Sequence, residues 1–190
     1  SSATLTNSTV SGNSVVAGGG GISNLGSATL TNSTISGNSA TFAGGIYNYS
    51  SATLTNSTIA SNSADYGGGI YNLGSLTLTN SIVANSAGGN DVLTDDGTTN
   101  ASGNNIVEDS SFRDSNILNQ DPQLSPLSDR DGTTQTHNPL NGSPAIDAGD
   151  NSEVPADSQD LDGDGNTSEP IPYEQRGEGF TRVNNNTVDI

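Results

Sequence analysis

The stretch SATLTNSTISGNSA, residues 27–40, decides the fold because close copies of it precede and follow it. Its leucine recurs at intervals of 25, 24 and 24 residues, as Leu5, Leu30, Leu54 and Leu78. A second block repeats an isoleucine every 24 residues, as Ile22, Ile46 and Ile70. Fixed self-similarity at this period indicates a repeat architecture with one structural unit per repeat.

The repeats consist of short runs of Thr, Val and Ile separated by Gly, Asn and Ser, which is typical of strands and turns. Helical repeats would need apolar residues at helical spacing together with strong helix formers. A leucine-rich repeat would need several leucines per copy, whereas each copy here has one or two. The sequence therefore predicts an all-β fold, a parallel β-helix (β-solenoid) with about 24 residues per coil.

Stacked coils place each residue next to its counterpart one period earlier, so the recurring Leu and Ile columns are predicted to form the core. Asparagines recur in the same way, and stacked amides can donate and accept from coil to coil. Three Asn columns are predicted: Asn7, Asn32, Asn56 and Asn80; Asn13, Asn38, Asn62 and Asn85; Asn24, Asn48 and Asn72.

Threonines flank each core leucine and are expected to point outward in two columns. They are Thr4, Thr6, Thr29, Thr31, Thr53, Thr55, Thr77 and Thr79. Arrays of this kind resemble the flat faces of ice-binding solenoids, which gives one alternative function. Thr is also an ordinary residue on exposed strands.

Composition restricts the possible functions. Only 29% of the 190 residues are hydrophobic, which suits a thin solenoid better than a thick globular core. The net charge is −17, and every acid except Asp65 lies beyond residue 90, so nucleic acid is not expected as a partner. Without Cys there are no disulfides, and no apolar run is long enough to predict a transmembrane segment. The chain lacks Met and opens within a repeat, so we expect it to be part of a larger precursor.

Beyond residue 88 the period loosens into an ordered series of short motifs: DPQLSPLSD, TTQTH, GSPAIDAGDN, EQRG and a closing VDI. With the repeats, this series resembles bacterial surface and secreted β-helix proteins that end in a choice-of-anchor Q domain. The segment DRDGTT departs from the family pattern. The resemblance implies a right-handed β-helix, an exported or surface-attached protein and no common enzymatic activity. We expect regular coils over 1–88, irregular coils over 89–146 and an acidic C-terminal cap over 147–190.

The segment DSQDLDGDGNTSEP carries the best site motif. Asp160, Asp162 and Asp164, followed by Gly165, match positions 1, 3, 5 and 6 of an EF-hand-type calcium loop. Position 12 is Ile171 instead of Glu, so Glu169 would have to complete the ligand shell, with the Asn166 carbonyl as a further ligand. The alternative is a solvated acidic turn. Further candidate ligands are Asp147, Asp150, Asp157 and Asp189.

His137 is the only histidine, which leaves no conventional zinc site, and we expect it to make a structural hydrogen bond. The repeat face offers neither a base beside calcium ligands nor two facing carboxylates, so no catalytic residues are predicted. The sequence favours a non-enzymatic, extracellular structural or adhesive module stabilised by Ca²⁺. Its expected partners are copies of itself, stacked head to tail into a filament, or a polysaccharide. The alternative is a protein that binds or cleaves polysaccharide.

Overall fold

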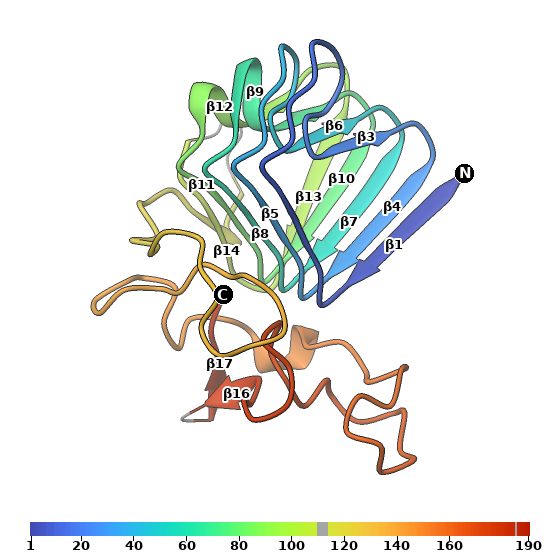
Figure 1. Ribbon diagram of the computed structural model, residues 1–190, viewed down its shortest axis with the longest axis vertical. Coiled ribbons are helices and arrows are strands. Elements are labelled where there is room, and N and C mark those ends of the chain that lie inside the picture. The colour runs from blue at the N-terminus through green and yellow to red at the C-terminus, as the bar shows by residue number, and fades with distance from the viewer. Residues whose placement is uncertain (110–113, 185) are drawn as a thin grey trace.

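The computed structural model describes residues 1–109, 114–184 and 186–190, and its body is a β-solenoid of about four turns (Figure 1). The first sheet contains β1 (Ser2–Thr6), β4 (Ser27–Thr31), β7 (Ser51–Thr55), β10 (Ser75–Thr79) and β13 (Thr98–Ser102). The second contains β2 (Thr9–Ser11), β5 (Thr34–Ser36), β8 (Thr58–Ala60), β11 (Ile82–Ala84), β14 (Asn105–Val107) and β15 (Ile117–Leu118). The third contains β3 (Ile22–Asn24), β6 (Ile46–Asn48), β9 (Ser63–Asn72) and β12 (Ala87–Thr94). Each of the first four coils adds one strand to each sheet.

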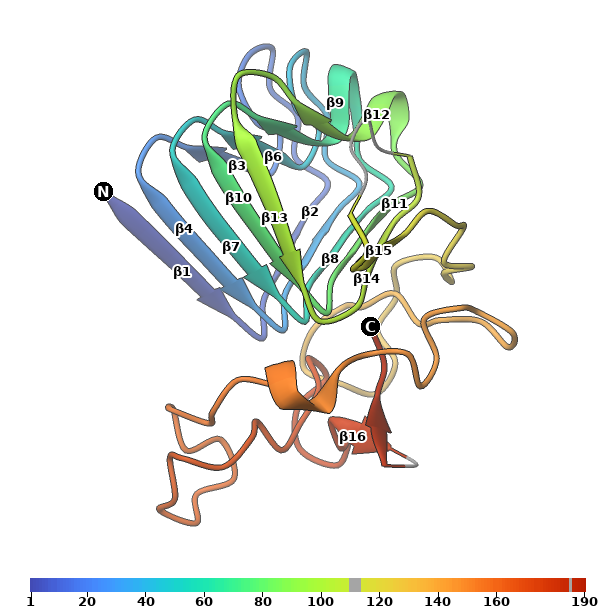
Figure 2. The same cartoon turned by 180° about the vertical axis from the view of Figure 1, so that it is seen from behind.

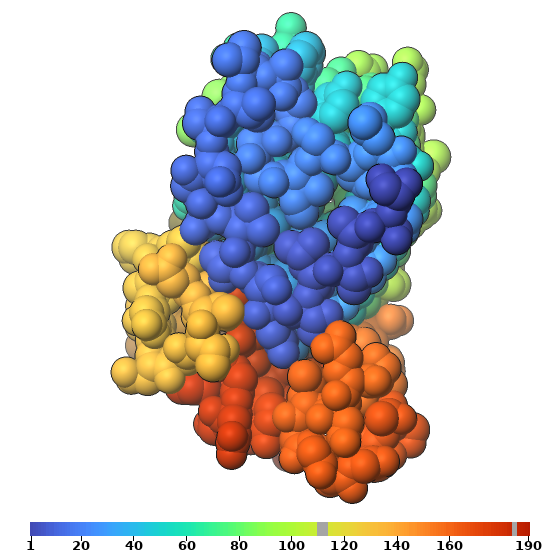
Figure 3. Space-filling view, turned by 45° about the vertical axis from the view of Figure 1, so that its right-hand side comes forward, coloured from blue at the N-terminus to red at the C-terminus, as the bar shows by residue number. Residues whose placement is uncertain are grey.

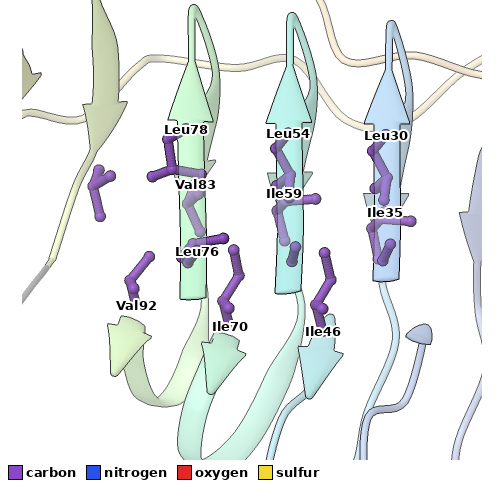
Figure 4. Close-up of a cluster of buried hydrophobic side chains, with 13 residues drawn as sticks. Leu30, Ile35, Ile46, Leu54, Ile59, Ile70, Leu76, Leu78, Val83 and Val92 are labelled. Atoms are coloured by element: carbon purple, nitrogen blue, oxygen red, sulfur yellow. The ribbon is translucent and has the colours of Figure 1, made fainter. Parts of the chain in front are cut away.

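Parallel pairing in register confirms the predicted core columns. Leu5 pairs with Leu30, Leu30 with Leu54 and Leu54 with Leu78. The isoleucine column of the third sheet pairs in the same way and continues to Val92 in β12. In the close-up of the core, the side chains of neighbouring coils occupy repeated positions inside the solenoid (Figure 4). The inner members of these columns are completely buried.

Two corners of the coil require a left-handed backbone, and the sequence provides it mostly with Asn and Gly. The corner between the first and second sheets is formed by Asn7, Asn32, Asn56 and Asn80, with φ between 44° and 50°. The next corner, after each strand of the second sheet, is formed by Gly12, Gly37, Ser61 and Asn85, with φ between 56° and 68°. Asn tolerates this conformation better than other side chains do, and Gly has no Cβ to obstruct it.

Residues 120–184 and 186–190, here called the flank segment, run along the side of the coils (Figures 1 and 2). They include the 3₁₀ helix η1 (Asn151–Glu153) and the antiparallel pair β16 (Val183–Asn184) and β17 (Thr187–Val188). Gln175 bonds Thr9 in the first coil and Thr34 in the second, whereas Asp150 bonds Asn80 in the fourth. The expectation of an end cap over 147–190 is therefore corrected, because this part lies beside several coils instead of over one end.

A second, smaller core joins the flank segment to the solenoid. Ile82, Ala84 and Ile106 belong to the second sheet and pack with the buried Ala145 of the flank segment. Leu124 and Ile190 pack against this cluster. The space-filling view shows the flank segment as a lobe against the coils (Figure 3). Apolar burial therefore contributes to the attachment together with hydrogen bonds.

Candidate metal centre

The acidic loop, residues 157–169, begins and ends at one point of the flank segment. Asp157 N donates to the carbonyl oxygen of Glu169 (2.7 Å), and an antiparallel bridge joins Ala156 to Pro170. Ile171 N in turn donates to Pro155 O (2.9 Å), and the Ile171 side chain is buried. These contacts hold the two ends side by side, so carboxylates that are twelve positions apart in the sequence can share one site.

The predicted trio Asp160, Asp162 and Asp164 does converge. One carboxylate oxygen from each lies within 4.8 Å of the other two. Oxygens that bind one Ca²⁺ at about 2.3–2.6 Å cannot be more than about 5 Å apart, so this spacing suits a shared cation. The turn forms as the motif predicts, because Gly165 N donates to Asp160 Oδ1 (3.0 Å) and Gly165 adopts φ 85°.

A second group brings Asp157 and Glu169 to Asp162, again with their oxygens within 4.8 Å of one another. Asp157 is the residue that makes this group unusual, because it is only 1% exposed. Its Oδ2 accepts from Leu161 N (2.7 Å), whereas its Oδ1 is buried without a hydrogen-bond partner. A buried, half-satisfied carboxylate beside like charges is costly unless a cation accompanies it.

Glu169 shows the electrostatic consequence of this arrangement. Its pKa is raised by desolvation and, to a smaller extent, by the charges of Asp164, Asp162, Asp157 and Asp160. Glu169 Oε1 is also buried without a partner, while Oε2 accepts from Asn166 Nδ2. The Asn166 side-chain oxygen accepts from Ser168 N and Oγ (3.2 and 2.8 Å). The two overlapping groups of carboxylates could therefore hold a metal ion, and only oxygen ligands line them.

The other candidate ligands lie outside these groups. Asp150 begins η1, where its Oδ1 accepts from Ser152 N and Oγ, and these bonds lower the pKa of Asp150. Asp189 Oδ1 accepts from Asp147 N (2.7 Å), next to the second core. Of the four additional acids, the structure brings only Asp157 to the acidic loop site.

Two Asn columns form coil-to-coil ladders of amide hydrogen bonds. Asn24 Nδ2 donates to Asn48 Oδ1 (2.8 Å), and Asn48 Nδ2 donates to Asn72 Oδ1 (2.7 Å). In the other ladder, Asn13 Nδ2 donates to Asn38 Oδ1, and Asn38 Nδ2 donates to Asn62 Oδ1. Asn85 does not continue this ladder, because the pairing of Ala60 with Ala84 places Ser86 next to Asn62. Asn85 belongs instead to the left-handed corner.

The third predicted column does not form a ladder of amide-to-amide bonds. The side chains of Asn32, Asn56 and Asn80 meet the flank segment, because a left-handed corner turns them away from the next coil. Asn32 Nδ2 donates to Tyr173 O (3.0 Å), and Asn80 both donates to Asp150 O (2.8 Å) and accepts from Asp150 N (2.9 Å). The Asn56 oxygen, turned toward Arg182, accepts from Arg182 Nε (2.8 Å). These asparagines are attachment points for the flank segment.

The structure also contains a ladder of serines that was not predicted from the sequence. Ser8 N donates to Ser33 Oγ (3.3 Å), Ser33 N to Ser57 Oγ (3.2 Å) and Ser57 N to Ser81 Oγ (3.2 Å). The signal was available, because these serines recur with the same spacing as the leucines. The hydroxyls of Ser33, Ser57 and Ser81 each satisfy a backbone N–H of the preceding coil, at the bend between the first and second sheets.

The predicted threonine face is only partly free. The column through Thr4, Thr29, Thr53 and Thr77 pairs in register on the outer face of the first sheet. In the second column, Gln159 Nε2 of the flank segment donates to Thr6 Oγ1 (3.3 Å), and Thr79 is buried. The second column of the proposed ice-binding face is therefore partly covered.

His137 makes the structural contacts expected of it. Nδ1 lies 2.7 Å from Ser125 O, which can only accept, so Nδ1 carries the proton and Nε2 accepts from Ser36 Oγ (2.8 Å). Burial lowers the pKa of His137, although the bond to Ser125 opposes this shift. The ring borders a cavity of about 290 Å³ between β5, β8 and the flank segment. Burial also lowers the pKa of Arg182 in this cavity to about 10.

No protein family, curated protein or solved structure compared with this chain matches it. Within the described ranges, no helix has the length and apolarity needed to cross a membrane.

Proposed function

We propose that this chain is a non-enzymatic scaffold module of an exported or surface protein, in which Ca²⁺ bound by the acidic loop fastens the flank segment to the solenoid. The observation that carries the proposal is the buried carboxylate of Asp157, with one unpartnered oxygen among neighbouring carboxylates. Oxygen-only ligands favour hard cations, and Ca²⁺ tolerates irregular coordination better than Mg²⁺ does. Binding in the 0.1–1 mM range, roughly that of extracellular calcium modules, would suit such a loop.

The position of the loop explains what the ion would do. A residue within the loop and a residue just beyond it contact the first two coils: Gln159 bonds Thr6, and the carbonyl of Tyr173 bonds Asn32. Without a cation, carboxylates within 4.8 Å repel one another in a chain that already carries a net charge of −17. Chelation should therefore loosen the flank segment before it affects the solenoid.

The test compares thermal unfolding and amide hydrogen exchange in about 1 mM Ca²⁺ and in EDTA. EDTA is expected to lower the melting temperature by roughly 3–6 °C and to speed exchange over residues 155–173, with exchange in β4 and β7 unchanged. Mg²⁺ at the same concentration should not replace Ca²⁺.

Two variants separate a cation site from a solvated turn. Asp162→Ala should abolish the sensitivity to EDTA. Compared with the unmodified protein, Asp157→Asn should have a lower melting temperature in Ca²⁺, because it lacks a ligand. In EDTA its melting temperature should be equal to or higher than that of the unmodified protein, because it also lacks a repelling charge. Asp65→Asn, a change to an exposed coil acid, is the control and should behave as the unmodified protein does. Identical melting and exchange with Ca²⁺ and EDTA would leave only the solvated acidic turn.

Self-association is a second candidate, supported by the first coil. Among the described residues, β1, β2 and β3 each pair on one side only, and Leu5, Val10 and Ile22 are only partly buried. A second copy stacked there would extend all three sheets, and such head-to-tail contact propagates into filaments. Electron microscopy at high protein concentration with Ca²⁺ tests this, and isolated particles alone would contradict it.

A further inference from the structure

Five of the eight aromatic residues of the chain gather at the third sheet and the turn that leads into it. This aromatic surface comprises Phe42, Tyr47, Tyr49, Tyr66 and Tyr71. Tyr47 pairs with Tyr71 in register, on the opposite side of the strands from the core isoleucines Ile46 and Ile70. The most exposed members are Tyr49, Tyr66 and Phe42, at 59%, 49% and 38%.

Three of the rings are near-parallel and lie close together. Phe42, Tyr66 and Tyr71 are mutually near-parallel, with interplanar angles of 13–18° and centroid separations of 5.6, 6.1 and 6.5 Å. A column of three stacked rings would separate the outer two by about 7 Å or more, since carbon contacts need about 3.5 Å. The longest separation is shorter than that, so the three rings do not form one column. They are offset from one another, and Phe42 and Tyr66 remain exposed.

A tilted ring and a carboxylate border these three rings. Tyr47 stands at 71° to Tyr71 and at 55° to Phe42, so it rises beside the near-parallel rings. The Tyr71 hydroxyl donates to Asp95 Oδ2 (2.9 Å), and this bond is the main reason that the pKa of Tyr71 is raised to about 12. Tyr71 therefore stays neutral at physiological pH, and Asp95 is held at the border as an acceptor.

The size and charge of the aromatic surface restrict what can bind there. Its three most exposed rings leave about 300 Å² accessible, well below the roughly 800 Å² per partner of a stable protein interface. Nucleic acid and anionic polymers are repelled by a net charge of −17. A neutral ligand with a flat C–H face and hydroxyl edges fits, because aromatic faces attract positively polarised hydrogens and Tyr and Asp bond hydroxyls.

We infer that the aromatic surface binds a neutral polysaccharide, with pyranose rings stacked on Phe42, Tyr66 and Tyr71 and a sugar hydroxyl donating to Asp95. This inference adds a ligand class to the proposed scaffold module. It does not depend on the acidic loop, which lies at the corner between the first and second sheets and not on the third.

The experiment measures retention of the protein, in Ca²⁺ and in EDTA, on cellulose, chitin, a soluble mixed-linkage β-glucan and starch, with alginate as the anionic comparison. Binding to at least one neutral polymer and none to alginate is expected. The double variant Phe42→Ala/Tyr66→Ala should lose at least tenfold in affinity. Asp95→Asn, which keeps an acceptor oxygen, should lose less.

The matched control is Thr29→Ala/Thr53→Ala, which alters the outer face of the first sheet and should bind as the unmodified protein does. Circular dichroism checks that both double variants remain folded. Failure of the unmodified protein to bind any neutral polymer, or full binding by the folded Phe42→Ala/Tyr66→Ala variant, would overturn the inference. Binding that persists in EDTA, with unfolding insensitive to chelation, would reject the calcium proposal alone.

Discussion

At the residue scale, asparagine has three distinct roles that its surroundings decide. Asn48 lies on a strand and extends the amide ladder, Asn85 occupies a left-handed corner, and Asn80 binds the flank segment. The 24-residue spacing predicted that Asn stacks, but it could not separate these roles. The backbone directs Asn48 along its column, whereas Asn80 and Asn85 both lie in left-handed corners, and Asn80 meets the flank segment there.

Replacing Asn48 with Ala should destabilise the protein by about 2–4 kcal/mol. Asn48 is completely buried, and its amide bonds Asn24, Asn72 and Ser75 O. Its removal leaves buried donors and acceptors unpaired, which costs more than the loss of an average hydrogen bond. Urea denaturation measures the change.

Asn85→Gly is the control for this variant, because Gly already occupies the same corner at Gly12 and Gly37. It should change the unfolding free energy by less than about 0.5 kcal/mol. Equal costs for Asn48→Ala and Asn85→Gly would contradict the distinction between ladder and corner.

At the element scale, the strands followed from the sequence because their signal is repeated. One copy of SATLT is too short to distinguish a strand from other extended chain, but each recurrence at the same interval adds an independent observation. The serine ladder was missed for a different reason. Ser8 and Ser33 form it through backbone N–H donors, which the side-chain pattern alone does not reveal.

Leu54→Ala should cost about 2–5 kcal/mol, because Leu54 is completely buried between Leu30 and Leu78 and its neighbours cannot close the cavity. Leu25→Ala is the matched control, since Leu25 is 75% exposed and should lose less than about 0.5 kcal/mol. Thermal or urea unfolding measures both. A similar loss in the two variants would mean that the leucine column does not form the core.

At the scale of the whole molecule, the placement of the flank segment could not be predicted from the sequence. It depends on single contacts between residues far apart in the chain, such as Gln175 with Thr9 and Asn80 with Asp150. These contacts occur once each, so no period reveals them. The acidic loop was predictable at Asp160, Asp162 and Asp164, whose spacing is local, whereas Asp157 joins them only because the ends of the loop meet.

The pH dependence of stability should report one attachment of the flank segment. Burial lowers the pKa of His137, so the unfolded chain binds more protons than the folded protein just below the ordinary histidine pKa, about 6.5. The stability contributed by neutral His137 is therefore present above that pH and is lost as the pH falls below it. Comparison with His137→Asn, whose amide can still donate to Ser125 O, isolates this contribution.

At about pH 8 the unmodified protein should have a higher melting temperature than His137→Asn. This difference should shrink as the pH falls to about 5. Glu174, Arg176, Arg182 and Asp189 also line the cavity, and their contributions are shared by both proteins. Parallel curves for the two proteins over this range would contradict a buried, neutral His137.

The unequal length of the first repeat has a practical consequence for protein engineering. Ser14 pairs with Ser39 and Gly19 pairs with Ala43, so four residues in the first coil occupy the place of three in the second. The extra residue lies in the bend that carries Val16, which is 85% exposed, and pairing is in register on both sides of it. This bend absorbs a change of length without disturbing the columns. A peptide tag or epitope grafted after Val16 would therefore be displayed on the surface of an intact solenoid.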